Sequence, residues 1–536
     1  MNAIHLTLIG MGVMGLSSQE VSARAKSPNI VLILADDMGY SDIGCFGSEI
    51  LTPNLDKLSQ NGVRFSQFYN ASRCCPTRAS LLTGLYQHQA GIGDMVGNLG
   101  TSSYQGYLNT KCVTLAEALK LNGYNTYMSG KWHVGNRTET LPLKRGFDHY
   151  FGLIDGAGSY FERIPYRKNQ QAPRWMLEDA DFNPPAKGFY MTNAITDYAL
   201  NFLGDETTKQ EPFFMYLAYT APHWPLHALP EDIAKYRGKY LRGWDILRAE
   251  RYDKMQKLGL IDPSTRLSER DANVPAWETL SPEDRKMWDL RMAVYAAMID
   301  RLDQNVGRVV AQLEKMGELN NTIIIFLADN GGCHEAVKNK GTYITTTGET
   351  GNPDSFDSYE YPWANVSNTP FRMHKHWVHE GGISTPFIAH YPGVFKAGQL
   401  VNQPGHIIDL MPTLLDFAGG TYPANFNGEN IVPMEGVSLK DVLTGGKLKR
   451  DQPLFWEHEG NRAMRQGDWK LVSQYDNQTK KFIEWELYNM KTDRSELKDL
   501  SNEKTELKNR MINDFEQWAS RVGVISKEVL DKKGNQ

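Results

Sequence analysis

Short apolar runs recur along the chain and predict the strands of a large α/β sheet. The runs are residues 29–35, 126–129, 212–219, 322–328 and 386–391. Near-continuous apolar runs of this length are typical of strands buried on both faces, as in a mostly parallel sheet. Apolar residues at helical spacing between the runs predict helices at 113–121 and 292–316. The long apolar stripe of the second helix indicates core packing.

The end of the chain follows a different pattern. Residues 419–435 are rich in Gly, Pro and Asn and predict a linker. Strand-like pieces at 453–457, 469–473 and 485–488 precede a charged helix at 503–522. We therefore expect a large α/β domain over 26–435 and a small C-terminal domain over 436–536. The small domain should hold an antiparallel sheet with a helix packed on it.

The first 25 residues have the pattern of an export signal. An apolar run at 6–16 precedes Ala23-Arg24-Ala25, a small-residue cleavage pattern, and the run is too short to span a membrane. The alternative is a buried N-terminal segment, because the start of the chain carries little positive charge. The pattern favours a signal peptide at 1–25, a secreted or periplasmic location and no membrane span.

Composition narrows the classes of partner. The formal net charge is -5 and no basic run follows the chain, so nucleic acid is not an expected partner. The five cysteines have irregular spacing and form no disulfide framework, and no CxxC pair or Cys/His cluster indicates zinc. An acidic substrate would therefore be held by a few local cations rather than by the overall charge.

Four of the predicted strands end in polar or charged residues. The ends are Asp36-Asp37, Gly130-Lys131-Trp132-His133, Thr220-Ala221-Pro222-His223 and Asp329-Asn330-Gly331-Gly332. In open α/β sheets, ligands bind at the carboxyl ends of the strands. One such ending is common in turns, but four together indicate a binding site. Asp36, Asp37, Asp329 and Asn330 offer only oxygen ligands, which suit Ca²⁺ or Mg²⁺ better than zinc.

Residues 74–84 read CCPTRASLLTG and predict a helix that starts beside a cysteine. Pro76 favours the first turn of a helix, which places Cys74 at the N-terminus. Backbone N–H groups and the helix dipole favour an anion there. One interpretation is a structural cysteine at a helix cap. The other is a nucleophile beside an anion site, with Arg78 one turn along to hold the anion.

The same segment resembles the C-x-P-[ST]-R-x-x-x-L-T-G signature of type I, formylglycine-dependent sulfatases. The resemblance continues, in the family's order, through NIVLILADDMGYSDIGCFG, TPNLDKL, GYNTYMSGKWHVG, RGFDHYFG, APHWPLHA, FLADNGG and FRMHKHWVHEGGISTPFIAHYPG, and it spans about residues 28–490. The stretch HQAGIGDM is similar to bacterial arylsulfatases and their glycan-acting relatives. The resemblance implies an alkaline-phosphatase-like α/β fold, with a large mixed, mostly parallel sheet between helices and a smaller C-terminal antiparallel sheet plus helix.

The resemblance also implies two groups that the sequence does not encode directly. A maturation enzyme would oxidise Cys74 to formylglycine, and Cys75 would be a variable position. One Ca²⁺ would be bound by Asp36, Asp37, Asp329, Asn330 and the formylglycine oxygen at Cys74. The catalytic sulfatase domain would cover residues 26–435.

The resemblance also implies which residues neutralise charge and which transfer protons. Arg78, Lys131 and Lys375 would neutralise the sulfate. One hydroxyl of the hydrated aldehyde would attack sulfur. His223 would protonate the leaving alkoxide, and His133 would take the proton whose loss releases sulfate.

We expect the substrate to be a sulfated carbohydrate, such as galactose or N-acetylhexosamine sulfate of glycans, attacked near a chain end, rather than a simple aryl sulfate. Residues flanking the catalytic set are expected to bind it: Trp224, His227, Arg372 and His376. Aromatic faces stack on sugars, and Arg and His donate to hydroxyls. The alternative is that Trp224 and Trp377 belong to the core. The polar, Gly-rich segment 333–372 predicts a long loop at one side of the pocket.

Two other functions stay open. A phosphonate or phosphodiester hydrolase of the same superfamily could share the signature and the formylglycine. A non-catalytic glycan-binding protein could use a decayed sulfatase scaffold. Decay usually removes the nucleophile, a metal ligand or a cation, and this sequence keeps all of them, which favours an enzyme.

Overall fold

The computed structural model describes residues 27–204, 211–337, 343–344, 346 and 348–534 of the 536-residue chain. The predicted export signal at 1–25 lies outside the described residues. Within these ranges, no helix is both long and apolar enough to cross a bilayer.

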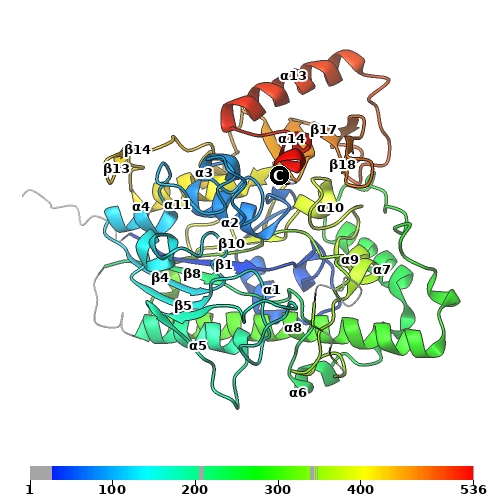
Figure 1. Ribbon diagram of the computed structural model, residues 1–536, viewed down its shortest axis with the longest axis horizontal. Helices are drawn as coiled ribbons and strands as arrows, with labels where there is room; N and C mark the ends of the chain where they lie inside the picture. The colour runs from blue at the N-terminus through cyan, green and yellow to red at the C-terminus, as the bar shows by residue number, and fades with distance from the viewer. Residues whose placement is uncertain (1–26, 205–210, 338–342, 345, 347, 535–536) are drawn as a thin grey trace, which may run out of the picture.

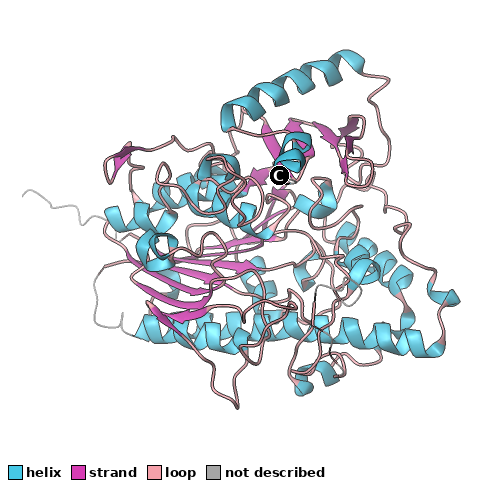
Figure 2. Ribbon diagram, in the orientation of Figure 1, coloured by secondary structure: helices cyan, strands magenta, loops and turns pink. Residues whose placement is uncertain are grey.

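A mixed ten-stranded sheet runs through the middle of the molecule (Figures 1 and 2). In order across the sheet, the strands are β11 (Gln399–Val401), β2 (Val63–Phe65), β10 (Phe387–His390), β9 (Thr322–Ala328), β1 (Asn29–Ala35), β8 (Phe213–Ala218), β4 (Asn125–Gly130), β5 (His149–Leu153), β6 (Trp175–Leu177) and β7 (Ala180–Asp181). The central strands β9, β1, β8, β4 and β5 are parallel, and β10 is antiparallel to both of its neighbours. This confirms the predicted mixed, mostly parallel sheet.

Helices cover both faces of the sheet. In chain order they are α1 (Pro53–Gln60), α2 (Cys74–Thr83), α3 (Gln87–Ala90), α4 (Leu115–Leu121), α5 (Met191–Gly204), α6 (Pro230–Ala234), α7 (Trp244–Lys257), α8 (Pro282–Lys315), α9 (Glu360–Ser367), α10 (Glu380–Ile383), α11 (Leu410–Ala418), α12 (Lys440–Leu443), α13 (Thr505–Val522) and α14 (Lys527–Gly534). The predicted helix at 113–121 is α4. The predicted helix at 292–316 is part of α8, which begins at Pro282 because Ser281 caps it. The first turns of α8 are polar and exposed, so they carry no apolar stripe.

Strand β1 shows why the sheet lies between two helical layers. All of its residues are buried, and successive side chains point to opposite faces. Val31 and Ile33 pack in the apolar cluster that contains α5 and α8. Ile30 and Leu32 pack in the cluster that contains α2, α4 and α11. Figure 1 shows these two groups of helices on opposite sides of β1.

The C-terminal part forms a smaller antiparallel sheet, as predicted. Its strands, in order, are β15 (Leu454–His458), β16 (Asn461–Gln466), β17 (Trp469–Ser473) and β20 (Glu486–Asn489). Helix α13, which lies at the top of Figure 1, packs on this sheet through one apolar cluster. The sequence did not predict β16, because NRAMRQ lacks a strand-like apolar run. The domain limits at 435 and 436 stay a prediction, although α12 packs with α11 of the larger part.

The segment 333–372 is not wholly a loop, which corrects the prediction from sequence. It contains α9, whose Trp363 is fully buried against Trp244 and Tyr240. The helix is short and its polar neighbours hide its pattern. Other short strand pairs are β3 (Phe68–Tyr69) with β12 (Gly405–His406), β13 (Asn425–Phe426) with β14 (Glu429–Asn430), and β18 (Tyr475–Asp476) with β19 (Lys481–Phe482).

Candidate active site

The four polar strand ends meet at one edge of the sheet. Strands β9, β1, β8 and β4 are consecutive neighbours, so their carboxyl ends lie side by side. Backbone hydrogen bonds join the segments that follow them. The Asp36 N–H donates to the Ala221 carbonyl (3.0 Å), and the Lys131 N–H donates to the Ala218 carbonyl (2.8 Å). The expected convergence of polar groups is therefore present.

Buried carboxylates and buried cations alternate at this edge. The ion pairs are Lys131 with Asp36 (2.5 Å), Lys375 with Asp37 (2.8 Å) and Arg78 with Asp329 (2.9 Å). All six side chains are almost completely removed from solvent. Burying an ion is costly unless it is paired, so these charges hold one another in place. The sequence-predicted carboxylates and cations thus form one continuous cluster.

The oxygen ligands of the cluster fit a hard divalent cation. Asp36 Oδ1 and Asn330 Oδ1 are buried, and neither has a hydrogen-bond partner among the described residues. The Asn330 amide donates to Asp37 Oδ1 at 2.7 Å, and this hydrogen bond joins the end of β9 to the end of β1. Burial and the neighbouring Asp36 raise the pKa of Asp329 to about 8. A bound Ca²⁺ ion would accept the lone pairs of the free oxygens and would offset the repulsion between the neighbouring carboxylates.

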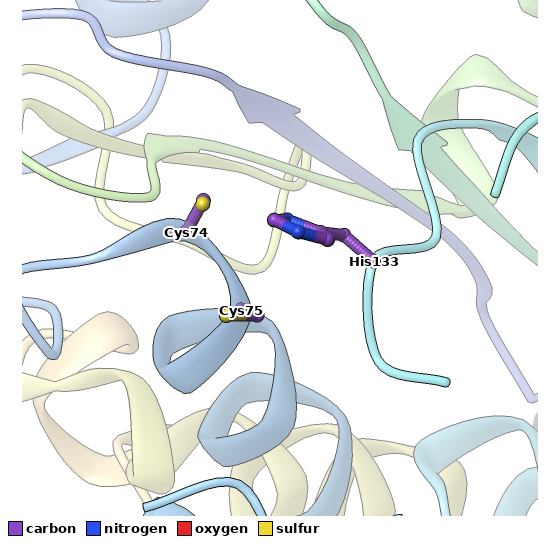
Figure 3. A group of neighbouring side chains, drawn as sticks. All are labelled: Cys74, Cys75 and His133. Carbon is purple, nitrogen blue, oxygen red and sulfur yellow. The ribbon is translucent and has the colours of Figure 1, made fainter. Parts of the chain in front are cut away.

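Cys74 is the first residue of α2 and is almost fully buried. Figure 3 shows the imidazole of His133 directed toward the start of this helix. A hydrogen bond from the Cys75 thiol, together with Lys131 and His133, holds the pKa of Cys74 well below its usual value despite burial. Cys75 lies deeper, with its sulfur 3.4 Å from that of Met95. The position of Cys74 therefore favours an anion.

The backbone around the site adopts conformations that most residues avoid. Asp37 and His133 have φ angles of 65° and 53°, in the left-handed region. Gly130, with φ of 124°, ends β4 where a Cβ atom would lie 1.9 Å from the Ala218 carbonyl oxygen. Only glycine fits there, and it lets Lys131 and His133 follow directly. Such strain persists where the surrounding structure holds the backbone firmly.

His223 is oriented by its own loop. Its Nδ1 donates to the Trp224 carbonyl at 2.6 Å. The other ring nitrogen, Nε2, lies 3.4 Å from Asp37 Oδ2 and 3.4 Å from Lys375 Nζ. Burial lowers the pKa of His223 to about 4. The ring is thus fixed with one nitrogen toward the charged cluster.

A cavity of about 580 Å³ opens above the cluster. Cys74, His133, His223 and Lys375 line it, and so does Trp224, the tryptophan expected to contact substrate. Further polar or aromatic side chains, which the sequence pattern did not indicate, also line it: Arg73, Asn136, Asp155, Tyr166, Arg167, Gln170, Glu335 and Tyr343. Arg73 directly precedes Cys74, and this position is the signal in the sequence that points to it. The others lie in loops whose sequence shows no pattern.

Three of the expected substrate-binding residues do not line this cavity. His227 is fully buried, and its Nε2 faces the Ser355 carbonyl at 2.9 Å. Arg372 pairs with Glu486 at 2.9 Å, and His376 pairs with Glu459 at 2.7 Å. Protein partners occupy their polar atoms. Adjacency in sequence to Lys375 or His223 therefore did not bring these side chains to the cavity.

Comparison with known proteins agrees with this geometry. The sulfatase family model matches residues 28–420, and the model for the N-sulphoglucosamine sulphohydrolase C-terminal region matches 371–520.

Individual relatives span most of the chain. An uncharacterized sulfatase of Schizosaccharomyces pombe is 36% identical over 531 residues, covering 94% of this chain and 95% of that protein. An arylsulfatase of Klebsiella aerogenes is 36% identical, covering 78% and 93%. The solved structure of Ps i-CgsB in complex with k-i-k-neocarrahexaose has a TM-score of 0.67 and 27% identity, covering 92% and 93%. This chain therefore belongs to the sulfatase family and is a sulfuric ester hydrolase with an alkaline-phosphatase-like fold.

Proposed function

We propose that this protein removes sulfate from sulfated carbohydrate, using a formylglycine made from Cys74 and a bound Ca²⁺. The observation that carries the proposal is the place of Cys74. It begins α2 at the base of the cavity, beside His133 and above a cluster of three buried cations. The retained cluster favours this enzyme over a non-catalytic glycan-binding protein.

The residues present fit both groups. Asp36, Asp37, Asp329 and Asn330 would hold Ca²⁺ through their oxygens, two of which lack a partner among the described residues. When present, the formylglycine hydrate supplies a hydroxyl nucleophile, and Ca²⁺ supplies positive charge that favours its ionised form. The sulfur of Cys74 lies where an oxygen of the formylglycine hydrate would lie, because both are bonded to the same side-chain carbon.

The cations give the cluster the right charge for an anionic substrate. Arg78, Lys131 and Lys375 balance the three buried carboxylates, so a divalent ion leaves the site positive. Preorganised charges in a dry site stabilise developing negative charge without rearranging. Lys375 lines the cavity itself and would contact the sulfate oxygens directly.

Two histidines would move protons. His223 directs Nε2 toward the cavity side of the cluster. The negative charge of a bound sulfate ester would favour a proton on Nε2 in addition to the one on Nδ1, and His223 would give this Nε2 proton to the leaving alkoxide. A ring nitrogen of His133 lies within 4.8 Å of the Cys74 sulfur. His133 would therefore take the proton from the second hydroxyl at position 74 and so allow sulfate to leave.

The cavity walls suit a sugar. The ring of Trp224 packs edge-on against Tyr343, and Tyr166 lines the same wall. Asp155, Glu335 and Arg167 offer hydrogen-bond acceptors and donors for hydroxyl groups. The names of relatives point both ways, to an arylsulfatase and to a protein solved with neocarrahexaose. We favour a galactose or N-acetylhexosamine sulfate at or near a chain end, and export of the protein to a secreted or periplasmic location.

The test compares the matured protein on four substrates: a sulfated monosaccharide or terminal disaccharide, an internally sulfated polymer, an aryl sulfate and a phosphodiester. The proposal predicts the highest kcat/KM on the terminal sulfated sugar. A much higher value on the aryl sulfate would overturn the carbohydrate assignment. Equal rates on polymer and chain end would exclude the terminal preference. Faster release of phosphate than of sulfate would favour the alternative, a phosphonate or phosphodiester hydrolase.

A further inference from the structure

A second group of potential metal ligands lies outside the candidate active site. It comprises His376, His458 and Glu459, each of which offers one ligand atom, and the three atoms lie within 4.8 Å of one another. His376 follows Lys375 in the loop before α10, His458 ends β15, and Glu459 lies in the turn to β16. Residues far apart in the sequence thus meet where the C-terminal sheet contacts the loop that carries Lys375.

The three side chains converge on one point. His376 Nδ1 lies 2.7 Å from Glu459 Oε2, and His458 Nε2 lies 3.7 Å from Glu459 Oε1. The two imidazole rings are 6.1 Å apart and nearly perpendicular. Both His376 and Glu459 have left-handed backbones, with φ of 91° and 50°. Two non-glycine residues in this region indicate a geometry that the surroundings enforce.

His458 is the least expected member of the group. Its side chain is completely buried, yet neither ring nitrogen has a hydrogen-bond partner among the described residues. Its Nε2 lies 3.7 Å from Glu459 Oε1, beyond hydrogen-bonding distance. An unsatisfied buried polar group is costly. A metal ion bound to this nitrogen would remove that cost.

We propose that His376, His458 and Glu459 form a second metal site, for zinc or a similar borderline divalent ion. Two imidazoles and one carboxylate are a ligand set that zinc prefers, whereas the oxygen set at Asp36 and Asp329 suits Ca²⁺. The ion takes the place of the proton between His376 Nδ1 and Glu459, and that proton is released to solvent.

The surroundings support an ion at this point. The side chains of His376 and Glu459 are 13% and 23% exposed, which gives an ion a way in. The other ring nitrogen of His376 lies 3.2 Å from the side-chain amide of Asn461, which holds the ring in place. Zinc at Nδ1 leaves the ring proton on this nitrogen, and a half-turn of the Asn461 amide presents its oxygen, which has no partner among the described residues, to accept it. The nearby positive charge of Arg73 is paired with Glu335 at 3.1 Å.

The bound ion joins two parts of the molecule. Glu459 and His458 belong to the β15–β16 hairpin, and His376 is next to Lys375, which lines the cavity. An ion that binds only the folded chain raises its stability in proportion to the logarithm of ion concentration. Zinc therefore raises the thermal unfolding midpoint of the full chain by clamping the hairpin to the Lys375 loop.

The experiment measures zinc bound to the full-length protein. Metal-depleted protein is equilibrated with excess CaCl₂, then dialysed against micromolar ZnCl₂, and zinc per chain is determined by elemental analysis. Wild type is compared with His458→Phe, which keeps a buried ring, and with Glu459→Asn, which tolerates the left-handed backbone but is shorter. His149→Gln is the matched control, because it removes a His–Glu pair of similar length, 2.8 Å.

The proposal predicts one zinc per chain in wild type and in His149→Gln, and none in His458→Phe or Glu459→Asn. Zinc should raise the unfolding midpoint only of the proteins that bind it. Zinc that persists in both variants, or no zinc in wild type, would overturn the proposal. If His458→Phe does not fold, Glu459→Asn decides. Sulfatase turnover with Ca²⁺ is recorded separately, so failure of the zinc site is distinguishable from failure of the proposed function.

Discussion

At the scale of single residues, position 74 concentrates several effects on one side chain. The N-terminus of α2, Lys131 and His133 all favour negative charge there. Cys75, one residue later, points into the apolar cluster of the second helical layer. Two adjacent cysteines therefore have different environments, and only the first lines the cavity.

This difference predicts opposite results for two neighbouring substitutions. Cys74→Ala should lower kcat on the order of 10⁴–10⁶-fold, because it removes the proposed nucleophile. Cys75→Ala should keep most of the activity, since Cys75 does not line the cavity. Circular dichroism and steady-state rates check both. Comparable losses in the two variants would contradict the assignment of position 74.

His223 gives a second prediction at this scale. His223→Ala should slow esters of poor leaving groups by about 10²–10⁴-fold and activated phenol sulfates much less, because only a basic alkoxide needs a proton as it leaves. A series of sulfate esters with different leaving-group pKa values measures this. An equal loss across the series would place His223 in sulfate binding instead.

The residues that form the charged cluster could be predicted from the sequence, whereas most of the cavity wall could not. Asp36, Lys131 and Asp329 directly follow buried strands, so the sheet determines where they lie. Glu335 and Arg167 belong to loops, where side-chain direction depends on contacts that no local pattern reveals. The same reason explains why His227 turned to the Ser355 carbonyl rather than to the cavity.

At the scale of elements, the adjacent ends of β1 and β9 build the proposed metal site. The two strands are paired in register from Asn29 with Thr322 to Ala35 with Ala328. That register places Asp36 and Asp37 directly beside Asp329 and Asn330. A one-residue shift would reverse the faces of all these side chains.

Chelation tests this pair of strand ends. Removing divalent ions should abolish turnover and lower the thermal midpoint. An ion whose free concentration is 100 times its Kd adds about 2.7 kcal/mol to the free energy of unfolding. Added Ca²⁺ should restore both, and metal analysis should find one Ca²⁺ per chain. Full activity after exhaustive chelation would count against the site.

Elements buried on both faces were predicted well, and short or polar ones were not. Strands β1, β8 and β9 are continuous apolar runs whose residues are all buried. Strands β6, β7 and β16 are short or polar and gain their pairing only from neighbours. Helix α9 has only eight residues and few turns to show a period. Tertiary contacts determine such elements more than local sequence does.

At the scale of the whole molecule, buried ions join the C-terminal sheet to the larger part. Lys470 of β17 contacts Glu380 of α10 at 3.0 Å and Glu496 at 2.7 Å. All three side chains are fully buried. Arg494 also contacts Glu380, at 3.2 Å. Glu380 begins α10, directly after the loop that carries Lys375. The network therefore anchors the end of the loop at the cavity.

Substituting Lys470 should therefore be far more damaging than substituting an exposed lysine. Lys470→Met removes one cationic partner from each of two buried carboxylates, Glu380 and Glu496. It should lower the free energy of unfolding by about 3–5 kcal/mol. Lys480→Met, which breaks the exposed Lys480–Asp531 pair, should cost less than about 1 kcal/mol. Urea unfolding midpoints of the two variants measure the difference. Equal midpoints would show that the network does not hold the C-terminal sheet.

The most direct test of the whole account is the chemical identity of residue 74 in active protein. Peptide mass spectrometry of the purified, catalytically competent enzyme, with a hydrazide to trap aldehydes, measures it. The account predicts an aldehyde at position 74, in a fraction that rises and falls with specific activity across preparations. A fully active preparation that carries only the free thiol at position 74 would contradict it.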